Sequence, residues 1–201
     1  MNNAENLLKK AKDLKNDKKY EKSIEILEKL FNHDAHSEEI KKELIGALFS
    51  YGIYLSDEYT MEYEKSVKIF KKIIEIEPDN YRAIYNLGIS YFNLGQKDKA
   101  MKAYNDAIKI KPDYKHCYYN IGLIYEVTND FQKALKCYKK ALEIDPKFVY
   151  ALQAKKIVKQ KLDSSRRKNL KSMQEEIIIC KNCGNVNRDT AKFCDSCGKE
   201  L

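Results

Sequence analysis

The chemistry in this chain is concentrated near its C-terminal end, where four cysteines form two C-x-x-C pairs. Cys180 and Cys183 make the first pair, and Cys194 and Cys197 make the second. A glycine follows each pair directly, and it tolerates the positive φ that lets two thiolates and nearby backbone N–H groups converge on one ion. Four thiolates in two such knuckles are the ligand set of a tetrahedral structural zinc site. The sequence therefore predicts one structural Zn²⁺ ion held by these four cysteines.

Two other roles of paired cysteines fit this segment less well. A redox dithiol would need a strand-to-helix setting, which neither pair has. A rubredoxin-like iron site is chemically possible, but the short spacing between the inner cysteines argues against it. About 25 residues cannot bury a self-sufficient core, whereas structural zinc contributes about 10–16 kcal/mol in comparable peptides. Ile178, Phe193 and Leu201 are expected to supply a minimal apolar cluster beside the metal.

Other residues capable of chemistry are scattered. Cys117 and Cys137 lie alone within a repeated stretch and are expected to be small core or surface fillers. The three histidines, His33, His36 and His116, have no serine or carboxylate arrangement around them. The chain also contains no phosphate-cradling glycine loop and no H-E-x-x-H sequence. The sequence thus predicts no catalytic residue and no enzymatic activity.

The stretch that must organise the rest of the chain is a 34-residue pattern that occurs twice between Tyr81 and Phe148. A fixed period of this length indicates stacked supersecondary units. Each unit is expected to be two antiparallel helices that approach most closely where both carry small side chains. The positions that match between the two copies are Asn86/Asn120, Gly88/Gly122, Tyr91/Tyr125, Ala100/Ala134, Tyr104/Tyr138, Ala107/Ala141 and Pro112/Pro146.

These residues resemble the tetratricopeptide repeat, a family with the same 34-residue period. The resemblance rests on N-L-G-x-x-Y starting at Asn86, on N-I-G-x-x-Y starting at Asn120, and on A-x-x-x-Y-x-x-A followed by proline in both copies. It implies an all-α fold, a right-handed solenoid of helical hairpins (a superhelix). The tail from 177 to 201 resembles the small zinc ribbons, which implies a small zinc-ribbon β domain after the solenoid.

The expected domain organisation follows from these two resemblances. A helical repeat domain is predicted over 1–162, with units at about 4–37, 38–80, 81–114 and 115–148 and a capping helix at 149–162. Residues 163–176 are expected to form a basic, charged linker or an extension of that helix. Residues 177–201 are expected to form the zinc ribbon.

The second unit departs from the period. Ala11 and Ser23 in the first unit stand 12 residues apart, the interval that also separates the small residues of the regular units. In the second unit, Gly46 followed by Phe49 resembles the glycine motif, but Gly46 and Ser66 stand 20 residues apart. About eight residues around YLSDEYTM are therefore added, either as a loop on one face or as a longer helical hairpin.

By the tetratricopeptide resemblance, the first helix of each unit lines a concave groove. An asparagine in each regular unit, Asn86 and Asn120, stands on that face, and a ladder of asparagines can hold the backbone of an extended peptide. The groove candidates are Arg82, Tyr85, Asn86, Ile89, Phe92 and Asn93 in the third unit, and His116, Tyr119, Asn120, Leu123 and Glu126 in the fourth.

Members of the family that bind chaperone tails clamp a terminal carboxylate with lysine, arginine and asparagine side chains. Leu8 and Lys12 stand where that pattern would require lysine and asparagine, so this partner is not expected. The function predicted is that of a non-enzymatic scaffold or adaptor, which binds an extended peptide or a partner protein in its groove. The zinc ribbon would be its second docking module.

The net charge of +8 is concentrated in one segment. Residues 1–154 hold 26 basic and 24 acidic residues, whereas 155–171 hold eight basic residues against Asp163 alone. Such a run could follow phosphates, which makes RNA or DNA binding through this segment and the ribbon the alternative function. The segment has no aromatic residue to stack on single-stranded bases, and a solvated lysine-rich cap is the commoner explanation.

No apolar run approaches the roughly 20 residues needed to span a bilayer, and the N-terminus lacks the apolar core of a signal peptide. A cytoplasmic protein without membrane contact is therefore expected, and no oligomeric state follows from the sequence.

Overall fold

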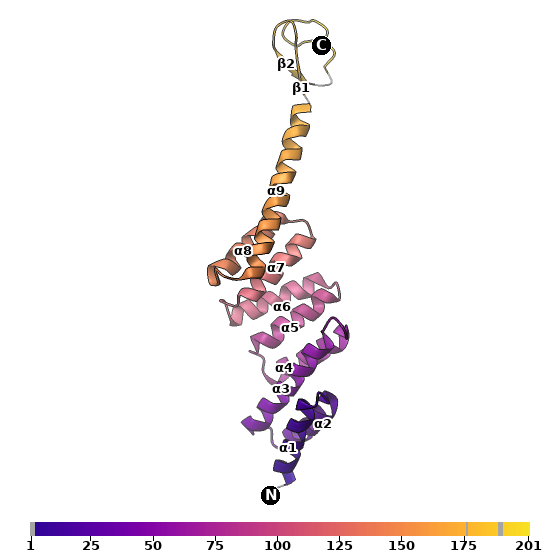
Figure 1. Ribbon diagram of the computed structural model, residues 1–201, viewed down its shortest axis with the longest axis vertical. Coiled ribbons are helices and arrows are strands. Elements are labelled where there is room, and N and C mark those ends of the chain that lie inside the picture. Colours follow the sequence, from indigo (N-terminus) through magenta and orange to yellow (C-terminus); the bar gives the residue numbers. More distant parts are fainter. Residues whose placement is uncertain (1–2, 176, 189–190) are drawn as a thin grey trace.

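The computed structural model describes residues 3–175, 177–188 and 191–201, and their side chains outside 168–177. Across these ranges the chain forms nine helices followed by two short strands (Figure 1). The helices are α1 (Asn3–Asn16), α2 (Tyr20–His33), α3 (Glu38–Leu55), α4 (Tyr63–Ile76), α5 (Tyr81–Asn93), α6 (Lys97–Ile110), α7 (Lys115–Val127), α8 (Phe131–Ile144) and α9 (Val149–Glu175). The strands are β1 (Ile177–Ile179) and β2 (Val186–Arg188).

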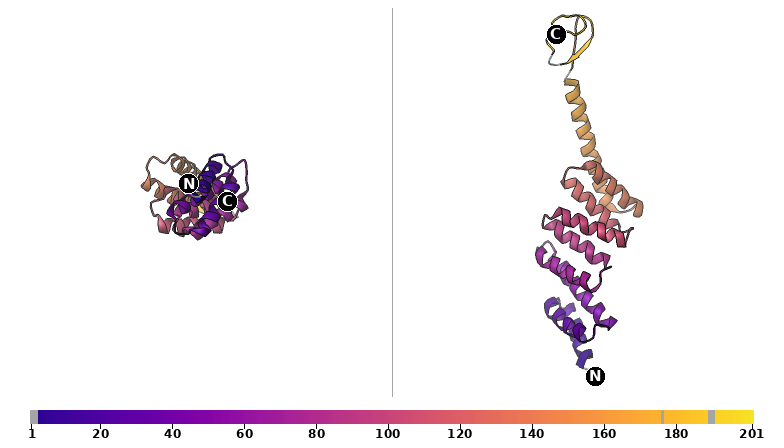
Figure 2. Two further views of the ribbon diagram at one scale, coloured as in Figure 1. Left: turned by 90° about the horizontal axis from the view of Figure 1, so that it is seen from below. Right: turned by 180° about the vertical axis from the view of Figure 1, so that it is seen from behind.

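The helices stack in chain order into an elongated array, because each one packs against the next. The two termini lie at opposite ends of the molecule (Figures 1 and 2). Helix α9 starts beside α8, then leaves the stack as a single helix, and the ribbon follows at its far end (Figure 1). This arrangement confirms the expected solenoid of helical hairpins followed by a small zinc-ribbon region. Residues 163–175 are helical, and residue 176 lies outside the described residues.

The hairpin turns recur with the repeat. In each of the four units, one residue between the paired helices has a positive φ: Lys18, Met61, Gly95 and Asn129. Several helices then begin with a side-chain cap. The Oδ1 atom of Asn80 accepts a hydrogen bond from the backbone N–H of Ala83 at 2.9 Å, which satisfies one of the free donors at the start of α5.

Each hairpin from the second unit onward is closed by a glycine that meets a buried ring. A Cβ atom on Gly52 would lie 2.8 Å from Cζ of Phe70, and one on Gly88 would lie 2.5 Å from Cε1 of Tyr104. Gly122 faces Tyr138 in the same way. Because the three rings are fully or almost fully buried, a side chain at any of these glycines would force the two helices apart.

Serine hydroxyls add a hydrogen bond at the same contact in the first two units. The Ser23 hydroxyl donates to the carbonyl oxygen of Ala11 at 2.7 Å, and the Ser66 hydroxyl donates to that of Gly52 at 2.9 Å. The pairing of Ala11 with Ser23 that the 12-residue interval indicated is thus confirmed.

The matching of Gly46 to the glycine of the repeat is wrong. Only the Nζ atom of Lys15, at 3.9 Å, lies near the Cβ position of Gly46, whereas Gly52 meets Phe70. Helix α3 has 18 residues, against 13 in α5, so most of the added residues lengthen the helix before Gly52. The remainder lie in the loop at 56–62. The insertion is therefore both a longer helix and a longer loop.

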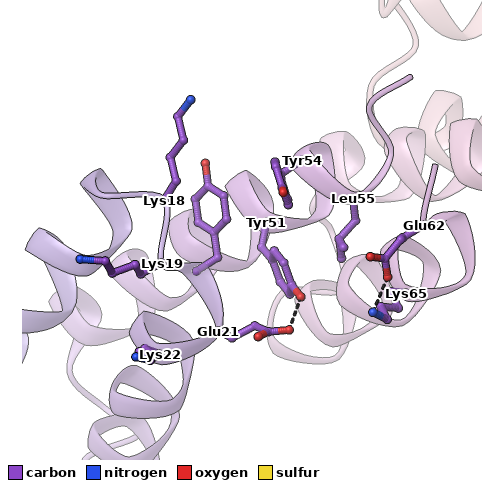
Figure 3. Close-up of a pocket in the computed structure, with 10 residues that line it drawn as sticks. Lys18, Lys19, Glu21, Lys22, Tyr51, Tyr54, Leu55, Glu62 and Lys65 are labelled. Atoms are coloured by element: carbon purple, nitrogen blue, oxygen red, sulfur yellow. Dashed lines mark hydrogen bonds and ion pairs between the residues drawn. The ribbon is translucent and has the colours of Figure 1, made fainter. Parts of the chain in front are cut away.

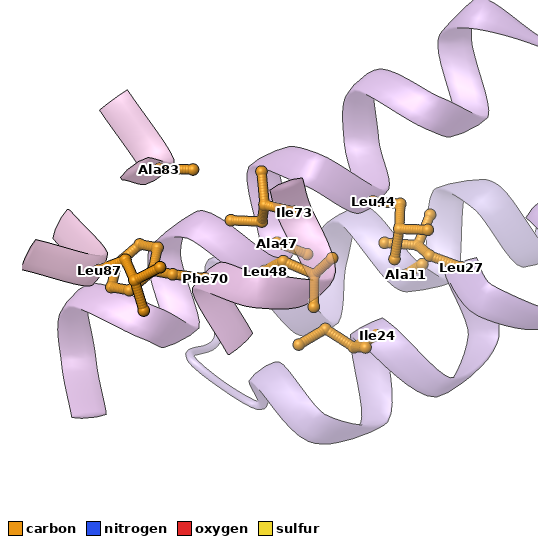
Figure 4. Close-up of a cluster of buried hydrophobic side chains, with 10 residues drawn as sticks. All are labelled: Ala11, Ile24, Leu27, Leu44, Ala47, Leu48, Phe70, Ile73, Ala83 and Leu87. Atoms are coloured by element: carbon orange, nitrogen blue, oxygen red, sulfur yellow. The ribbon is translucent and has the colours of Figure 1, made fainter. Parts of the chain in front are cut away.

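The apolar core runs through the stack rather than being confined to single units. Its largest cluster joins the first three units and includes Leu27 of α2, Leu48 of α3, Ile73 of α4 and Leu87 of α5 (Figure 4). Because α5 contributes to this cluster and also to the next one, neighbouring units bury each other's apolar faces, as repeat proteins require.

We predict that Gly52→Ala destabilises the protein by about 1–3 kcal/mol, because the added methyl group overpacks the contact with Phe70. The matched control is Gly46→Ala in the same helix, which should be neutral or stabilising by up to about 1 kcal/mol, because alanine favours a helix over glycine. Urea unfolding followed by circular dichroism at 222 nm measures both. Equal effects of the two substitutions would contradict the assignment of Gly52 to the hairpin contact.

Candidate metal centre and concave groove

The four cysteines of the tail converge on one point. Their Sγ atoms all lie within 4.8 Å of one another. The Sγ atoms of Cys180 and Cys197 are 3.6 Å apart, and those of Cys183 and Cys194 are 3.5 Å apart. Four sulfur atoms bound tetrahedrally to zinc at about 2.3 Å would be about 3.8 Å from one another. The cluster therefore fits a single zinc ion without rearrangement of the backbone.

Two tight turns hold these cysteines in place. The backbone N–H of Gly184 donates to the carbonyl oxygen of Cys180, and that of Gly198 donates to Cys194, both at 2.8 Å. The glycines have φ angles of 75° and 67°, a conformation that other residues adopt at a cost. Backbone N–H groups of Cys183 and Asn182 lower the pKa of the Cys180 thiol, which favours the thiolate form that binds metal.

The rest of the ribbon is organised around a buried asparagine. Strands β1 and β2 pair antiparallel, with Ile179 opposite Val186. The Nδ2 atom of Asn187 donates to the carbonyl oxygen of Asn185, and its Oδ1 accepts from the N–H of Asp195, both at 2.9 Å. Asn187 thus joins β2 to the second cysteine knuckle.

The apolar cluster expected beside the metal is only partly present. Ile178 and Leu201 are half-buried, but the Phe193 side chain is 59% exposed, so its assignment to the cluster is wrong. The zinc ligands and Asn187 provide the interior that a larger domain would build from apolar side chains. Asn187 was missed because an asparagine in a short strand is ordinarily placed at the surface.

The remaining cysteines and histidines form no reactive group among the described residues. Burial raises the pKa of the Cys117 thiol to about 12 and that of the Cys137 thiol to about 11, so both are poor nucleophiles. His116 packs between Tyr114 and Phe148, with ring centroids at 5.2 and 5.0 Å. His33 and His36 are exposed.

Two of the residues predicted to line a groove lie in a cavity between α7 and α9. A cavity of about 440 Å³ there brings together two predicted groove residues, Tyr119 and Leu123, with Tyr150, Gln153 and Ile157 of α9. The side chains of Tyr150 and Ile157 are 64% and 47% exposed. Large apolar groups therefore face solvent from one wall of this cavity.

From the second unit onward, the equivalent position of each first helix carries an aliphatic side chain. Ile89, Leu123 and Ile157 stand 34 residues apart, and in the second unit Ile53 follows Gly52 just as Ile89 follows Gly88. Ile53 and Ile157 were not among the predicted groove residues. The 34-residue period after Leu123 indicates Ile157, whereas Ile53 corresponds to Ile89 only when Gly52, not Gly46, is matched to Gly88.

The two asparagines of the predicted ladder are already engaged within the chain. The Nδ2 atom of Asn86 donates to the carbonyl oxygen of Arg82 at 2.7 Å. That of Asn120 donates to the hydroxyl oxygens of Tyr85 at 3.2 Å and Tyr104 at 3.4 Å. The amide nitrogen of Asn120 thus uses both of its hydrogens within the chain, whereas that of Asn86 uses one. The two amide oxygens and the second N–H of Asn86 are the groups through which a ligand could be bound.

The other predicted groove residues of α5 differ in their exposure. The guanidinium of Arg82 lies 5.3 Å from the ring centroid of Phe49 in the preceding unit. Tyr85 is half-buried, and its desolvation raises the pKa of its hydroxyl, whereas Asn93 at the end of α5 is exposed. Phe92 is half-buried.

A second cavity, of about 330 Å³, lies between the turn after α1 and the end of α3 (Figure 3). The ring of Tyr20 packs 5.7 Å from those of Tyr51 and Tyr54. The Tyr51 hydroxyl donates to Glu21 at 2.5 Å, and Glu62 pairs with Lys65. The carboxylates that line this cavity between the first two units are therefore already paired within the protein.

We predict one zinc ion per chain and loss of the tail's structure, but not of the helices, when a chelator removes the ion. Structural zinc contributes folding free energy directly, whereas the stack has its own apolar core. Native mass spectrometry gives the stoichiometry, and amide spectra report on the tail while circular dichroism reports on the helices.

The matched control uses two cysteine substitutions. Cys194→Ser should lower the zinc affinity, whereas Cys137→Ser, in the helical stack, should leave the bound zinc unchanged. A tail that keeps its dispersed amide signals in metal-free buffer would refute the structural role of zinc.

In the described part of the chain, no helix combines the length and apolar character needed to cross a bilayer.

Comparison with known families matches both parts of the chain. The tetratricopeptide repeat model matches residues 81–114 and 117–148, and the zinc-ribbon domain model matches residues 179–201. A comparison with curated proteins finds no match.

Solved structures show the same architecture. A crystal structure of MamA is 34% identical, with a TM-score of 0.54, and the alignment covers 73% of this chain and 80% of that one. The first TPR of Spaghetti (RPAP3), bound to an HSP90 peptide, is 21% identical with a TM-score of 0.54 and covers 59% of this chain and 93% of its own. YrrB, a TPR protein with an unusual peptide-binding site, is 18% identical with a TM-score of 0.53, and the coverage is 75% and 90%. With its repeats, its hairpin contacts and its four-cysteine tail, this chain belongs to the tetratricopeptide repeat family and ends in a zinc-ribbon domain.

Proposed function

We propose that this protein is a non-enzymatic scaffold or adaptor that binds an extended peptide segment of a partner protein along its concave face. Tetratricopeptide repeat domains mediate binding to proteins and peptides, and the family is typically non-enzymatic. The observation that carries the proposal is the open apolar cavity between α7 and α9, which Tyr119, Leu123, Tyr150 and Ile157 line.

Apolar contact is the main source of affinity in this groove. Exposed aliphatic and aromatic side chains rarely gather on a soluble surface without a binding role. Ile53, Ile89, Leu123 and Ile157 occupy the equivalent position from the second unit onward, with Ile53 and Ile157 exposed and the other two half-buried. An extended peptide can place alternate side chains against such a surface.

The charges beside the cavity are paired within the protein and hold its wall in place. Lys161 of α9 forms an ion pair with Glu126 of α7 at 2.7 Å, and the Tyr138 hydroxyl donates to the same carboxylate at 2.9 Å. The ion pair joins α9 to α7 and the Tyr138 hydrogen bond joins α8 to α7, so the cavity is formed before a peptide arrives. A preformed groove lowers the entropy cost of binding.

Two structural relatives support a peptide ligand. The RPAP3 repeat domain was solved with an HSP90 peptide, and YrrB is described as having an unusual peptide-binding site. The carboxylate clamp of chaperone-tail binders has no counterpart at the first unit, where Lys12 pairs with Glu39 at 2.8 Å and Leu8 packs against the core.

The zinc ribbon is the second docking module in this proposal. Its cross-strand pair, Ile179 and Val186, is 60% and 56% exposed, and Phe193 is 59% exposed. Apolar side chains that a larger domain would bury are therefore presented outward on a metal-stabilised frame.

We predict that Ile157→Glu weakens peptide binding at least tenfold, because it places a charge in the apolar wall of the groove. Burial of one aliphatic side chain is worth about 1.5–3 kcal/mol. The matched control is Leu152→Glu on another face of α9. Leu152 is 45% exposed and Ile157 is 47% exposed, so the two substitutions disturb packing to a similar degree. The probes are peptides selected on the full-length protein from a random 12-residue display library, measured by fluorescence anisotropy.

Selected peptides that bind both variants with the same affinity would exclude the groove as the binding site. A library that yields no peptide above background would count against peptide binding altogether.

A further inference from the structure

Helix α9 presents three different faces along its length. Ala151 and Val158 are buried on the face that packs against α8, while Tyr150 and Ile157 face the groove. The third face, called the basic face below, carries Lys155, Lys156, Lys159, Arg166 and Arg167.

The spacing of these five cations aligns them on one side of the helix. They stand at i, i+1, i+4, i+11 and i+12, which at 3.6 residues per turn is a single stripe. Helix α9 is unbroken from Val149 to Glu175, so the stripe extends over roughly 18 Å. Asp163 is the one acidic residue on it. Lys168 and Lys171 of the same basic segment lie outside the described side chains.

The cations of the basic face are available to a partner. Among the described side chains, none of the five forms an ion pair, whereas Lys161 on the groove side of α9 pairs with Glu126 and Lys115 of α7 pairs with Asp145. Lys156, Lys159, Arg166 and Arg167 are exposed, and Lys155 is half-buried.

Capping of the stack explains only part of this stripe. In the preceding units the same side of the first helix packs against a second helix, and Lys156 stands 34 residues after Gly122. Because α9 has no second helix, lysines there keep the last unit soluble. Arg166 and Arg167, however, lie beyond Leu162, a packed residue near the end of the stack. No helix of the stack lies beside this part of α9 (Figure 1), so capping does not require cations there. The two arginines still fall on the lysines' side of the helix.

We propose that the basic face of α9 binds the phosphate backbone of duplex DNA without reading its sequence. Lysine and arginine side chains supply this kind of contact. An α-helix about 10–12 Å across fits the B-form major groove, which is about 12 Å wide. The deep, narrow major groove of duplex RNA does not admit it.

Two other polyanions fit the basic face less well. Single-stranded nucleic acid is bound with the help of aromatic side chains, and the stripe from Lys155 to Arg167 contains none. An anionic bilayer is bound by helices with a large apolar face, but residues 163–167 (DSSRR) have no apolar side chain to insert.

The test measures binding of the full-length, zinc-loaded protein to a fluorescein-labelled 20-base-pair duplex by anisotropy over a range of salt. Five phosphate contacts give a slope of log K against log salt of about −4.5, which corresponds to about 500-fold weaker binding at 200 mM than at 50 mM salt. Arg166→Gln/Arg167→Gln should reduce the slope by about 2 in magnitude. Because both side chains project from an exposed helix, this variant is expected to remain folded, and circular dichroism checks it.

The matched control, Lys133→Gln/Lys140→Gln, removes the same charge from α8, where both lysines are paired with neighbouring carboxylates. It should leave the slope unchanged. Equal slopes for the two double variants, or equal or tighter binding to duplex RNA, polyglutamate or phosphatidylserine vesicles, would overturn the proposal. Binding to the DNA with the expected slope, lost selectively with Arg166 and Arg167, supports it whatever the outcome for the peptide groove.

Discussion

The architecture depends on the contact between a glycine and a buried aromatic ring inside each hairpin from the second unit onward. Gly52, Gly88 and Gly122 allow the paired helices to approach until the ring of the second helix lies against the backbone of the first. This approach sets the spacing of the two helices in a unit.

The two parts of the chain obtain their stability in different ways. The stack buries apolar side chains that neighbouring units share, so its core grows with each repeat. The tail is too short for that and relies on four thiolates around one ion. Because the metal site takes the place of an apolar core, the side chains of Ile179, Val186 and Phe193 are left at the surface of the ribbon.

Periodic features were predictable from the sequence, and features set by contacts across helices were not. The regular units and the zinc ligands follow from spacing alone. Gly46 and Gly52 lie in the same helix, and the position of Phe70 on the facing helix shows which of them closes the hairpin. The hydrogen bonds of Asn120 to two tyrosines join three helices, so no local pattern reveals them. Helix α9 was expected to end the stack, but it also forms one wall of a cavity with α7.

Because α9 is an unbroken helix, the lysines near its start and the arginines further along it keep a fixed angle to one another about the helix axis. Inserting one residue between Lys159 and Arg166 would turn the arginines by about 100° relative to the lysines, and inserting seven would return them to within about 20°. The groove wall at Ile157 lies before any such change and would be unaffected. Length variation in this segment is therefore constrained to whole multiples of the helical repeat if the cations are to act together, whereas a flexible linker of the same composition would tolerate any length.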